Sequence, residues 1–262
     1  MEEVAINNKK GLSVGKSFLV LFLSFISDSF WMVFAGNAIL ILGAGGVKVG
    51  AFENYIYLLA EVISYVIFIR IYESLTESKL RFSNTLKINK YIFIVLIVIS
   101  YIFIYDNTLN IFVEKFTTNS WYNEVIQEEL NSPITLILGA LIVAPIFEEI
   151  LLRGIILEGL IIKNKPYVAI TISSLLFALM HGNLVQIPNA FFIGLVIGII
   201  YYRTRSLLPC IFAHFVNNFF VVITEYYPTL YDDTRFSSIK LGLSIVIFIS
   251  SFYMFRRSVR ES

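Results

Sequence analysis

A long apolar segment, residues 134–162, contains three ionisable residues near its centre, Glu148, Glu149 and Arg153. Its other residues are mostly Leu, Ile, Ala, Val and Gly, and a membrane-spanning helix needs only about 20 apolar residues. One ionisable side chain at the centre of a bilayer costs roughly 2.5–3.5 kcal/mol, so three of them facing lipid would be strongly unfavourable. The segment therefore predicts a helix that turns these side chains toward other helices or toward water inside the protein.

Helical geometry assigns the three charges different surroundings. Glu149 and Arg153 are four residues apart, about 40° from each other around a helix, which favours an ion pair between them. Glu148 lies about 140° from Arg153, so it must face another partner or a cavity. Pro145 removes a backbone donor and is expected to kink the helix beside Glu148.

Composition extends this interpretation to the whole chain. Hydrophobic residues make up 57% of it and the mean hydropathy is +0.78, whereas soluble domains are nearer 45–50% apolar. The net charge of +1 and the absence of a basic stripe exclude a nucleic-acid-binding surface. The single cysteine, Cys210, lies in an apolar segment and is expected to be a buried structural thiol.

Eight apolar segments predict an all-α, polytopic membrane protein with its polar site inside the bundle. The chain is expected to form one transmembrane domain over residues 1–262, with N-terminal spans in 17–105 and a motif-bearing core at about 133–223. The predicted spans are residues 17–42, 55–71, 91–105, 134–162, 166–181, 185–202, 206–224 and 238–255.

Residues 106–132 are acidic and connect the third span to the fourth. Within them, Trp121, Tyr122, Val125 and Ile126 recur at helical spacing. We expect an amphipathic helix lying in the membrane interface.

The distribution of basic residues predicts the orientation of the spans. With the N-terminus in the cytoplasm, most Lys and Arg residues fall on the cytoplasmic side, and Arg153 alone is left in the membrane. The cytoplasmic set is Lys9, Lys10, Lys16, Arg70, Lys79, Arg81, Lys87, Lys90, Lys163, Lys165, Arg203, Arg205, Arg256, Arg257 and Arg260, against Lys48, Lys115, Arg235 and Lys240 outside. We therefore expect an integral membrane protein, of a bacterial plasma membrane, with both termini cytoplasmic. The sequence leaves open whether the cavity opens to the cytoplasm or sideways into lipid, and the basic turns at Lys163 and Arg203 favour the cytoplasm.

Both histidines of the chain lie in apolar segments that follow the acidic pair. His181 is preceded by Phe177, one turn earlier on the same helix face. His214 is followed by Asn218 within about 40° on its face, and Asn217 lies about 60° off on the other side, so the choice of Asn218 is a preference only.

These polar groups would have to meet in the bundle interior, where each can be satisfied. Together, Glu148 and an imidazole could hold and deprotonate a water molecule, while an imidazole and an amide could donate hydrogen bonds to a developing oxyanion. Such a set suits amide hydrolysis. The sequence offers no serine in a nucleophile elbow, so water is the expected nucleophile.

Three motifs of this chain resemble those of a known family, the CAAX-prenyl-endopeptidase and bacteriocin-processing (CPBP, or Abi) intramembrane proteases. They are E-E-x-x-x-R at Glu148, F-x-x-x-H at Phe177 and H-x-x-x-N at His214. The resemblance covers about residues 133–223, including Gly194-x-x-x-Gly198, whereas the first half of the chain matches only in being spanning helices. The two glycines, four residues apart, are expected to allow close helix packing and not to form a ligand-binding loop.

The resemblance implies a glutamate-type protease that works without a bound metal. Glu148 and His181 would activate water, and His214 and Asn218 would form the oxyanion hole. Glu149 and Arg153 would support the site as a structural pair. The implied substrates are peptides or lipidated membrane proteins, and bacterial members process peptides or protect against them.

Other interpretations of the same residues stay open. The chain could be a non-catalytic membrane regulator or bacteriocin-immunity protein that binds a peptide, a sensor or another membrane protein. It could also be a transporter that relays protons through Glu148 and the histidines. Two histidines and a carboxylate could bind zinc, although the H-E-x-x-H pattern is absent. Asp28 and Glu61 are expected to make interhelical hydrogen bonds or to line the site.

Overall fold

The computed structural model is helical over the part of the chain that it describes, residues 11–50, 52–76, 80, 82, 86–116, 127, 130–227, 229, 231 and 236–260. Seven of the described helices are long and apolar enough to cross a membrane, and an eighth apolar helix, α9, is shorter. The prediction of an all-α, polytopic membrane protein with about eight apolar segments is confirmed.

The spanning segments are longer than the sequence predicted, and several are built from consecutive helical pieces. The helices are α1 (Val14–Ala44), α2 (Glu53–Thr76), η1 (Ile88–Lys90), α3 (Tyr91–Tyr105), η2 (Asp106–Asn110), α4 (Ile111–Phe116), α6 (Pro133–Leu138), η3 (Gly139–Val143), α7 (Ala144–Glu149), η4 (Ile150–Leu157), α8 (Glu158–Lys163), α9 (Pro166–Met180), α10 (Gln186–Thr204), α11 (Leu207–Tyr226) and α12 (Ser238–Arg260). Trp121, Tyr122, Val125 and Ile126, whose spacing predicts the amphipathic helix, lie outside the described residues.

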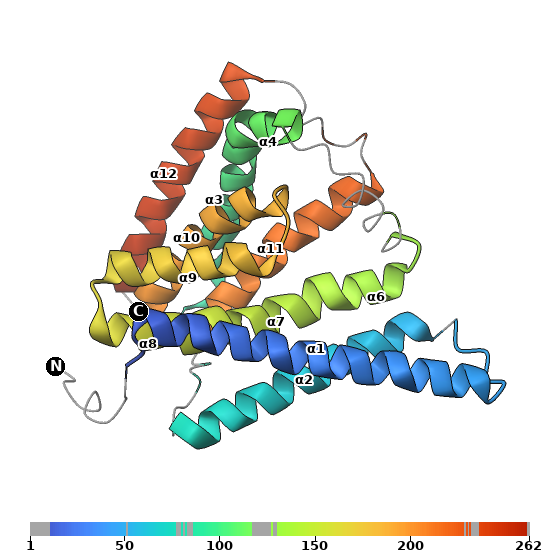
Figure 1. Cartoon of the computed structure of the whole chain (residues 1–262). Coiled ribbons are helices and arrows are strands. Elements are labelled where there is room, and N and C mark those ends of the chain that lie inside the picture. The colour runs from blue at the N-terminus through green and yellow to red at the C-terminus, as the bar shows by residue number, and fades with distance from the viewer. Residues whose placement is uncertain are drawn as a thin grey trace.

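The helices form a bundle around the continuous rod that runs from α6 to α8 (Figure 1). Helices α1 and α2 pack on each other as an antiparallel pair beside this rod. On the other side, α9 packs on α10, α12 packs on α3, and α11 packs on α3, α10 and α7. The rod thus lies between two groups of helices, and its inward side chains are shielded from lipid.

One end of the bundle, which we call the basic end, gathers the predicted cytoplasmic turns. There the Arg205 guanidinium lies 2.9 Å from the Glu158 carboxylate, joining the start of α11 to α8. Lys90 Nζ donates to the Ser258 carbonyl at 2.6 Å, joining the start of α3 to the end of α12. The basic end therefore combines residues from four separate segments of the chain.

The opposite end, which we call the far end, is held by contacts between other helix termini. Asn54 Nδ2 donates to Ser132 Oγ at 2.6 Å, joining the start of α2 to the start of α6. The Ser237 amide donates to Asn107 Oδ1 at 2.9 Å, joining the start of α12 to the end of α3. Each long helix thus runs from one end to the other.

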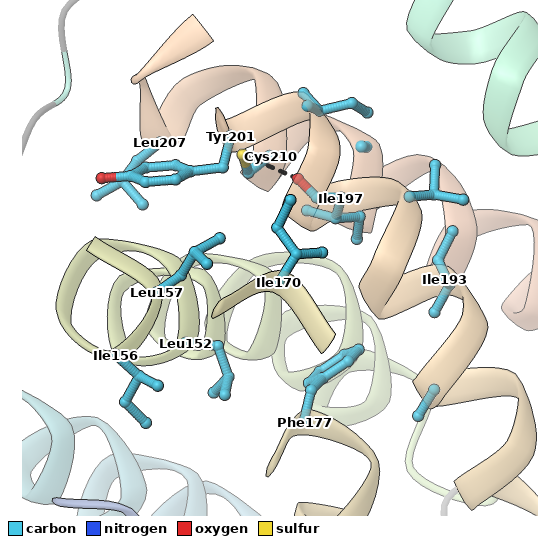
Figure 2. Close-up of a cluster of buried hydrophobic side chains, with 14 of the residues drawn as sticks. Leu152, Ile156, Leu157, Ile170, Phe177, Ile193, Ile197, Tyr201, Leu207 and Cys210 are labelled. Atoms are coloured by element: carbon cyan, nitrogen blue, oxygen red, sulfur yellow. Dashed lines mark hydrogen bonds between the residues drawn. The ribbon is translucent and has the colours of Figure 1, made fainter. Parts of the chain in front are cut away.

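Close-packed apolar side chains fill the bundle between the rod, α9, α10 and α11 (Figure 2). Cys210 is fully buried in this cluster, with its thiol 3.9 Å from the Ile197 carbonyl, so the prediction of a buried structural thiol is confirmed. The cluster includes Leu152, Ile156, Leu157, Ile170, Phe177, Ile193, Tyr201 and Leu207.

The two glycines of α10 allow it to approach α9 closely. A Cβ atom at Gly194 would lie 3.2 Å from the backbone Cα of Ser174, and one at Gly198 would lie 2.9 Å from Ile170 Cγ2. These distances confirm the predicted role of the Gly-x-x-x-Gly motif in helix packing.

Gly194→Val is expected to destabilise the bundle by about 1–3 kcal/mol, because the added side chain meets backbone that cannot move aside cheaply. The measurement is the midpoint of thermal unfolding in detergent. Gly43→Val is the matched control, since nothing lies within 4 Å of a Cβ added at Gly43. Equal midpoints for the two variants would contradict this account.

Candidate active site

A cavity of about 780 Å³ lies inside the bundle. Its wall includes all four residues predicted to carry the chemistry, Glu148 from α7, His181 at the end of α9, and His214 and Asn218 from α11. The structure therefore brings together residues that are up to 70 positions apart in the sequence, from Glu148 to Asn218.

The predicted ion pair between Glu149 and Arg153 is present and completely buried. Arg153 Nη1 lies 2.9 Å from Glu149 Oε1, and both side chains are 0% exposed. Arg153 Nη2 donates to the Gly194 carbonyl at 3.1 Å, and its guanidinium lies 4.8 Å from the centre of the Phe177 ring. The pair thus ties the rod to α9 and α10.

Glu149 has a second partner that the sequence did not predict. His214 Nδ1 lies 2.9 Å from Glu149 Oε1, the same oxygen that binds Arg153. A carboxylate oxygen only accepts, so the hydrogen of this bond is on Nδ1. No spacing signal could have revealed the contact, because it joins two helices 65 residues apart.

Glu148 faces the other side of the same imidazole. Its Oε2 lies 3.9 Å from His214 Nε2, beyond hydrogen-bonding distance, and its side chain is 17% exposed. The prediction that Glu148 would be separated from Arg153 is confirmed, since it lines the cavity instead. The His214 ring is thus bonded to Glu149 through Nδ1, and its Nε2 faces Glu148.

The Phe177 ring positions both histidines. It makes edge-to-face contacts with His181, at 5.1 Å between ring centres, and with His214, at 5.6 Å. His181 Nδ1 lies 3.0 Å from the Phe177 carbonyl, which can only accept, so Nδ1 carries the hydrogen. In the neutral ring this leaves Nε2 of His181 as a hydrogen-bond acceptor.

An irregular helical turn before Pro145 anchors Asn218. In η3 the Ala144 amide donates to the Gly139 carbonyl rather than to that of Ala140, and Pro145 has no amide hydrogen to replace it. The Ala140 carbonyl instead accepts from Asn218 Nδ2 at 2.8 Å. Pro145 therefore shapes the cavity wall. The helical turn before it is wide, and the Ala140 carbonyl accepts a hydrogen bond from Asn218 instead of from the backbone.

Asn217 and Asn218 both line the cavity, so this position does not decide between the two asparagines that the sequence offered as partners of His214. Asn217 Nδ2 donates to Asn218 Oδ1 at 3.1 Å. This bond fixes the Asn218 amide with its nitrogen toward α6 and η3. Since Nδ2 carries two hydrogens and Ala140 takes one, the second is geometrically free to serve a ligand.

The two acids of the N-terminal helices have different surroundings. Glu61 on α2 is part of the cavity wall, in agreement with the lining role expected for it. Asp28 on α1 has a buried Oδ1 with no hydrogen-bond partner among the described residues, so its expected interhelical hydrogen bond is not seen there. The hydroxyls of Ser27 and Ser64 join α1 to α2 instead, at 3.1 Å.

The basic turns are not part of the cavity wall. The wall residues come from the halves of the helices nearer the far end, and Lys163 and Arg203 are not among them. An opening toward these turns stays a prediction.

His181 and His214 could instead be ligands of a metal ion. Across the described parts of the chain, no three His, Cys, Asp or Glu side chains are grouped so that they could hold a metal ion. Independence from metal stays a prediction, tested below.

Comparison with known proteins relates part of this chain to membrane proteases. Residues 130–220 match the family model "Type II CAAX prenyl endopeptidase Rce1-like". The chain is 36% identical over 96 residues to the "Putative membrane peptidase YdiL" of Bacillus subtilis (strain 168), covering 37% of this chain and 39% of that protein. It is 37% identical over 90 residues to the "Membrane-embedded CAAX protease MroQ" of Staphylococcus aureus (strain USA300), covering 32% and 36% respectively.

The match thus spans less than two fifths of each curated relative. It falls on the segment that supplies Glu148, His181, His214 and Asn218. No solved structure matches significantly.

Glu149→Gln is expected to lower the abundance and thermal stability of the protein more than Glu148→Gln. Removing one partner of a buried ion pair typically costs about 3–5 kcal/mol because the other charge is left uncompensated, and Arg153 is completely buried. Quantitative immunoblots of membranes and unfolding midpoints in detergent measure both variants. Equal losses would show that the two carboxylates are not divided in this way.

Proposed function

We propose, on the premise that residues 130–220 form a Rce1-like CAAX prenyl endopeptidase domain, that this chain is an intramembrane endopeptidase. It hydrolyses a peptide bond in a peptide or a membrane-protein substrate. The observation that carries the proposal is the position of the His214 imidazole between two carboxylates. Its Nε2 faces Glu148 at the cavity, and its Nδ1 is bonded to Glu149.

Glu148 and His181 activate the water molecule that attacks the substrate. Glu148 is the one carboxylate of the acidic pair that reaches the cavity, and the neutral His181 ring keeps Nε2 as an acceptor. One of these groups takes a proton from the water while the water oxygen attacks the carbonyl carbon of the substrate. Holding the nucleophile between two acceptors orients its lone pair toward that carbon.

The developing oxyanion is stabilised by His214 and Asn218. Because His214 Nδ1 already donates to Glu149, Nε2 can donate only when the ring carries a hydrogen on both nitrogens. Asn218 supplies the second Nδ2 hydrogen. Donors fixed in place before the reaction stabilise the transition state without reorganising, and one such donor is typically worth about 2.7–4 kcal/mol.

Collapse of the tetrahedral intermediate completes the reaction. The C–N bond breaks as the proton taken from water passes to the leaving nitrogen, and the products are a carboxylate and an amine. Glu149 and Arg153 act as positioning residues, since neither lies on the cavity wall.

The proposal places the protein in a bacterial plasma membrane with both termini in the cytoplasm. Its support is the excess of Lys and Arg at the basic end together with the seven membrane-spanning helices. A membrane-protein partner, such as a sensor or an immunity target, belongs to the alternative in which the cavity binds a peptide without cleaving it.

Glu148→Ala and His214→Ala are each expected to reduce product formation by about 10²-fold or more, because each removes an acid–base or oxyanion group. The measurement compares the membrane peptidomes of cells carrying the native chain and each variant at matched protein levels. Glu73→Ala, at the basic end of α2, is the control for loss of a carboxylate. If both site variants keep the full cellular phenotype and peptidome, the regulator or immunity function replaces the protease.

Metal independence has its own test. Once a product peptide is identified, its formation by purified protein is expected to be unchanged by excess 1,10-phenanthroline, because carboxylate and imidazole groups supply the acid–base chemistry. Loss of activity that added zinc restores would show a metalloprotease instead.

A further inference from the structure

We infer that Gln186 and Asn189 on α10 form a subsite that binds main-chain carbonyl groups of an extended substrate beside the scissile bond. Both residues line the cavity, and neither belongs to the three motifs that the sequence analysis singled out. The inference rests on the proposed protease function. It adds, to the residues of the reaction, a pair that holds the substrate.

The cavity-lining residues of α10 share one face of the helix. Their spacing of three to four residues is the one that a single helix face requires. The first two are polar and the rest apolar, so the polar pair lies at the start of this face, close to the loop that follows His181. The five residues are Gln186, Asn189, Ala190, Ile193 and Ile197.

The Gln186 side chain is held by its oxygen. The Gln186 backbone amide donates to Asn183 Oδ1 at 2.9 Å, so Asn183 Nδ2 is the donor end of that side chain. This Nδ2 donates to the His181 carbonyl at 2.9 Å and to Gln186 Oε1 at 2.6 Å. The two hydrogens of Gln186 Nε2 then have no partner among the described residues.

Tyr101 on α3 orients the Asn189 side chain in the same way. Its hydroxyl donates to Asn189 Oδ1 at 2.6 Å and lies 3.1 Å from the Asn189 carbonyl. A distance of 2.6 Å is typical of an O–H···O bond and short for a bond from an amide nitrogen, so Oδ1 is the atom that faces Tyr101. Within the described part of the chain, both hydrogens of Asn189 Nδ2 are left without an acceptor.

These two amides differ from other amides on the cavity wall. Asn54 Nδ2 donates to Ser132 Oγ, and Asn217 Nδ2 donates to Asn218 Oδ1, so each has a hydrogen bonded within the protein. Fixing a side chain costs conformational entropy. Donors that the fold has already fixed can bind a ligand without a further loss of side-chain freedom.

The charge of the cavity indicates which acceptor suits these donors. The described wall carries the carboxyl groups of Glu61, Asp106, Glu148 and Glu225, and no Lys or Arg is among its residues. Such a wall disfavours an anionic ligand group. The acceptor that fits the two amides is therefore an uncharged carbonyl oxygen.

The spacing of the pair suits an extended main chain. Side chains three residues apart on a helix have Cβ atoms about 5–6 Å apart. Along an extended peptide, carbonyls that point the same way recur every two residues, about 6.6 Å apart. An extended segment can thus offer one carbonyl to Gln186 and the next such carbonyl to Asn189.

The test uses a substrate taken from the cell. The peptidome of cells with the native chain, compared with that of Glu148→Ala cells, identifies a cleavage site. The probe is an internally quenched synthetic peptide that spans this site, and kcat and KM are measured with the purified full-length protein in detergent.

Gln186→Met and Asn189→Leu are each expected to raise KM about 3- to 10-fold and to leave kcat within about twofold. Each variant removes one uncharged hydrogen bond, and a bond made equally before and during the reaction affects KM alone. Unfolding midpoints show that the variants are folded, and Asn189→Leu decides the inference if Gln186→Met does not accumulate.

Tyr101→Phe tests the orientation of Asn189 from outside the cavity, because Tyr101 is not on its wall. It is expected to raise KM about twofold or more, since it releases Asn189 Oδ1. Tyr201→Phe is the matched control, because its buried hydroxyl donates to Glu158 at the basic end, and its KM is expected to equal that of the native chain.

A change in the substrate shows whether the contact is direct. Peptides in which one bond near the cleavage site is replaced by a trans-alkene lack that carbonyl and keep the extended shape. At the bond whose carbonyl Asn189 binds, the alkene is expected to raise KM about 3- to 10-fold for the native chain. It is expected to add less than about twofold in Asn189→Leu, because the partner is already absent.

Unchanged KM values in Gln186→Met and Asn189→Leu, or a loss of kcat alone, would overturn the inference and leave the protease standing. Alkene and Asn189→Leu effects that multiply at every bond would also overturn it, as would equal KM values for Tyr101→Phe and Tyr201→Phe. A peptidome that is identical in native and Glu148→Ala cells would instead reject the protease, and the subsite with it.

Discussion

One carboxylate oxygen holds the centre of this protein together. Glu149 Oε1 binds the Arg153 guanidinium and the His214 imidazole at 2.9 Å each, inside a bundle where none of its surface is exposed. A buried carboxylate without cationic partners would be strongly destabilising, so the rod and α11 must stay in register for the bundle to remain folded. The position of His214 in the cavity is a direct consequence of this requirement.

Adjacent residues on the rod have opposite environments. A step of about 100° around a helix turns Glu148 to the cavity, where it is 17% exposed, and leaves Glu149 sealed between helices. The acid to which we assign the chemistry is thereby separated from the acid that is buried in an ion pair. The wide turn of η3 extends this arrangement, because the carbonyl that it releases fixes Asn218 on the facing helix.

Helical periodicity and intramembrane charge predicted much of this from the sequence. They indicated the eight apolar helices, the Glu149–Arg153 pair, the close packing at Gly194 and the residues that line the cavity. They could not predict the bond from Glu149 to His214 or the one from Asn218 to Ala140, because each joins helices whose relative rotation is set by packing. The basic turns could not indicate which residues line the cavity, since charge reports the orientation of a bundle and not where its core is filled.

The shortness of α9 has a consequence for the surrounding lipid. Its fifteen residues reach about 22 Å, whereas the hydrocarbon layer is about 30 Å thick. If its first turn lies at the headgroups beside Lys163 and Lys165, the helix ends within the hydrocarbon layer. His181 directly follows its last residue. Lipid chains next to α9 would have to shorten or splay to meet it, so the bilayer beside His181 is expected to be locally thin.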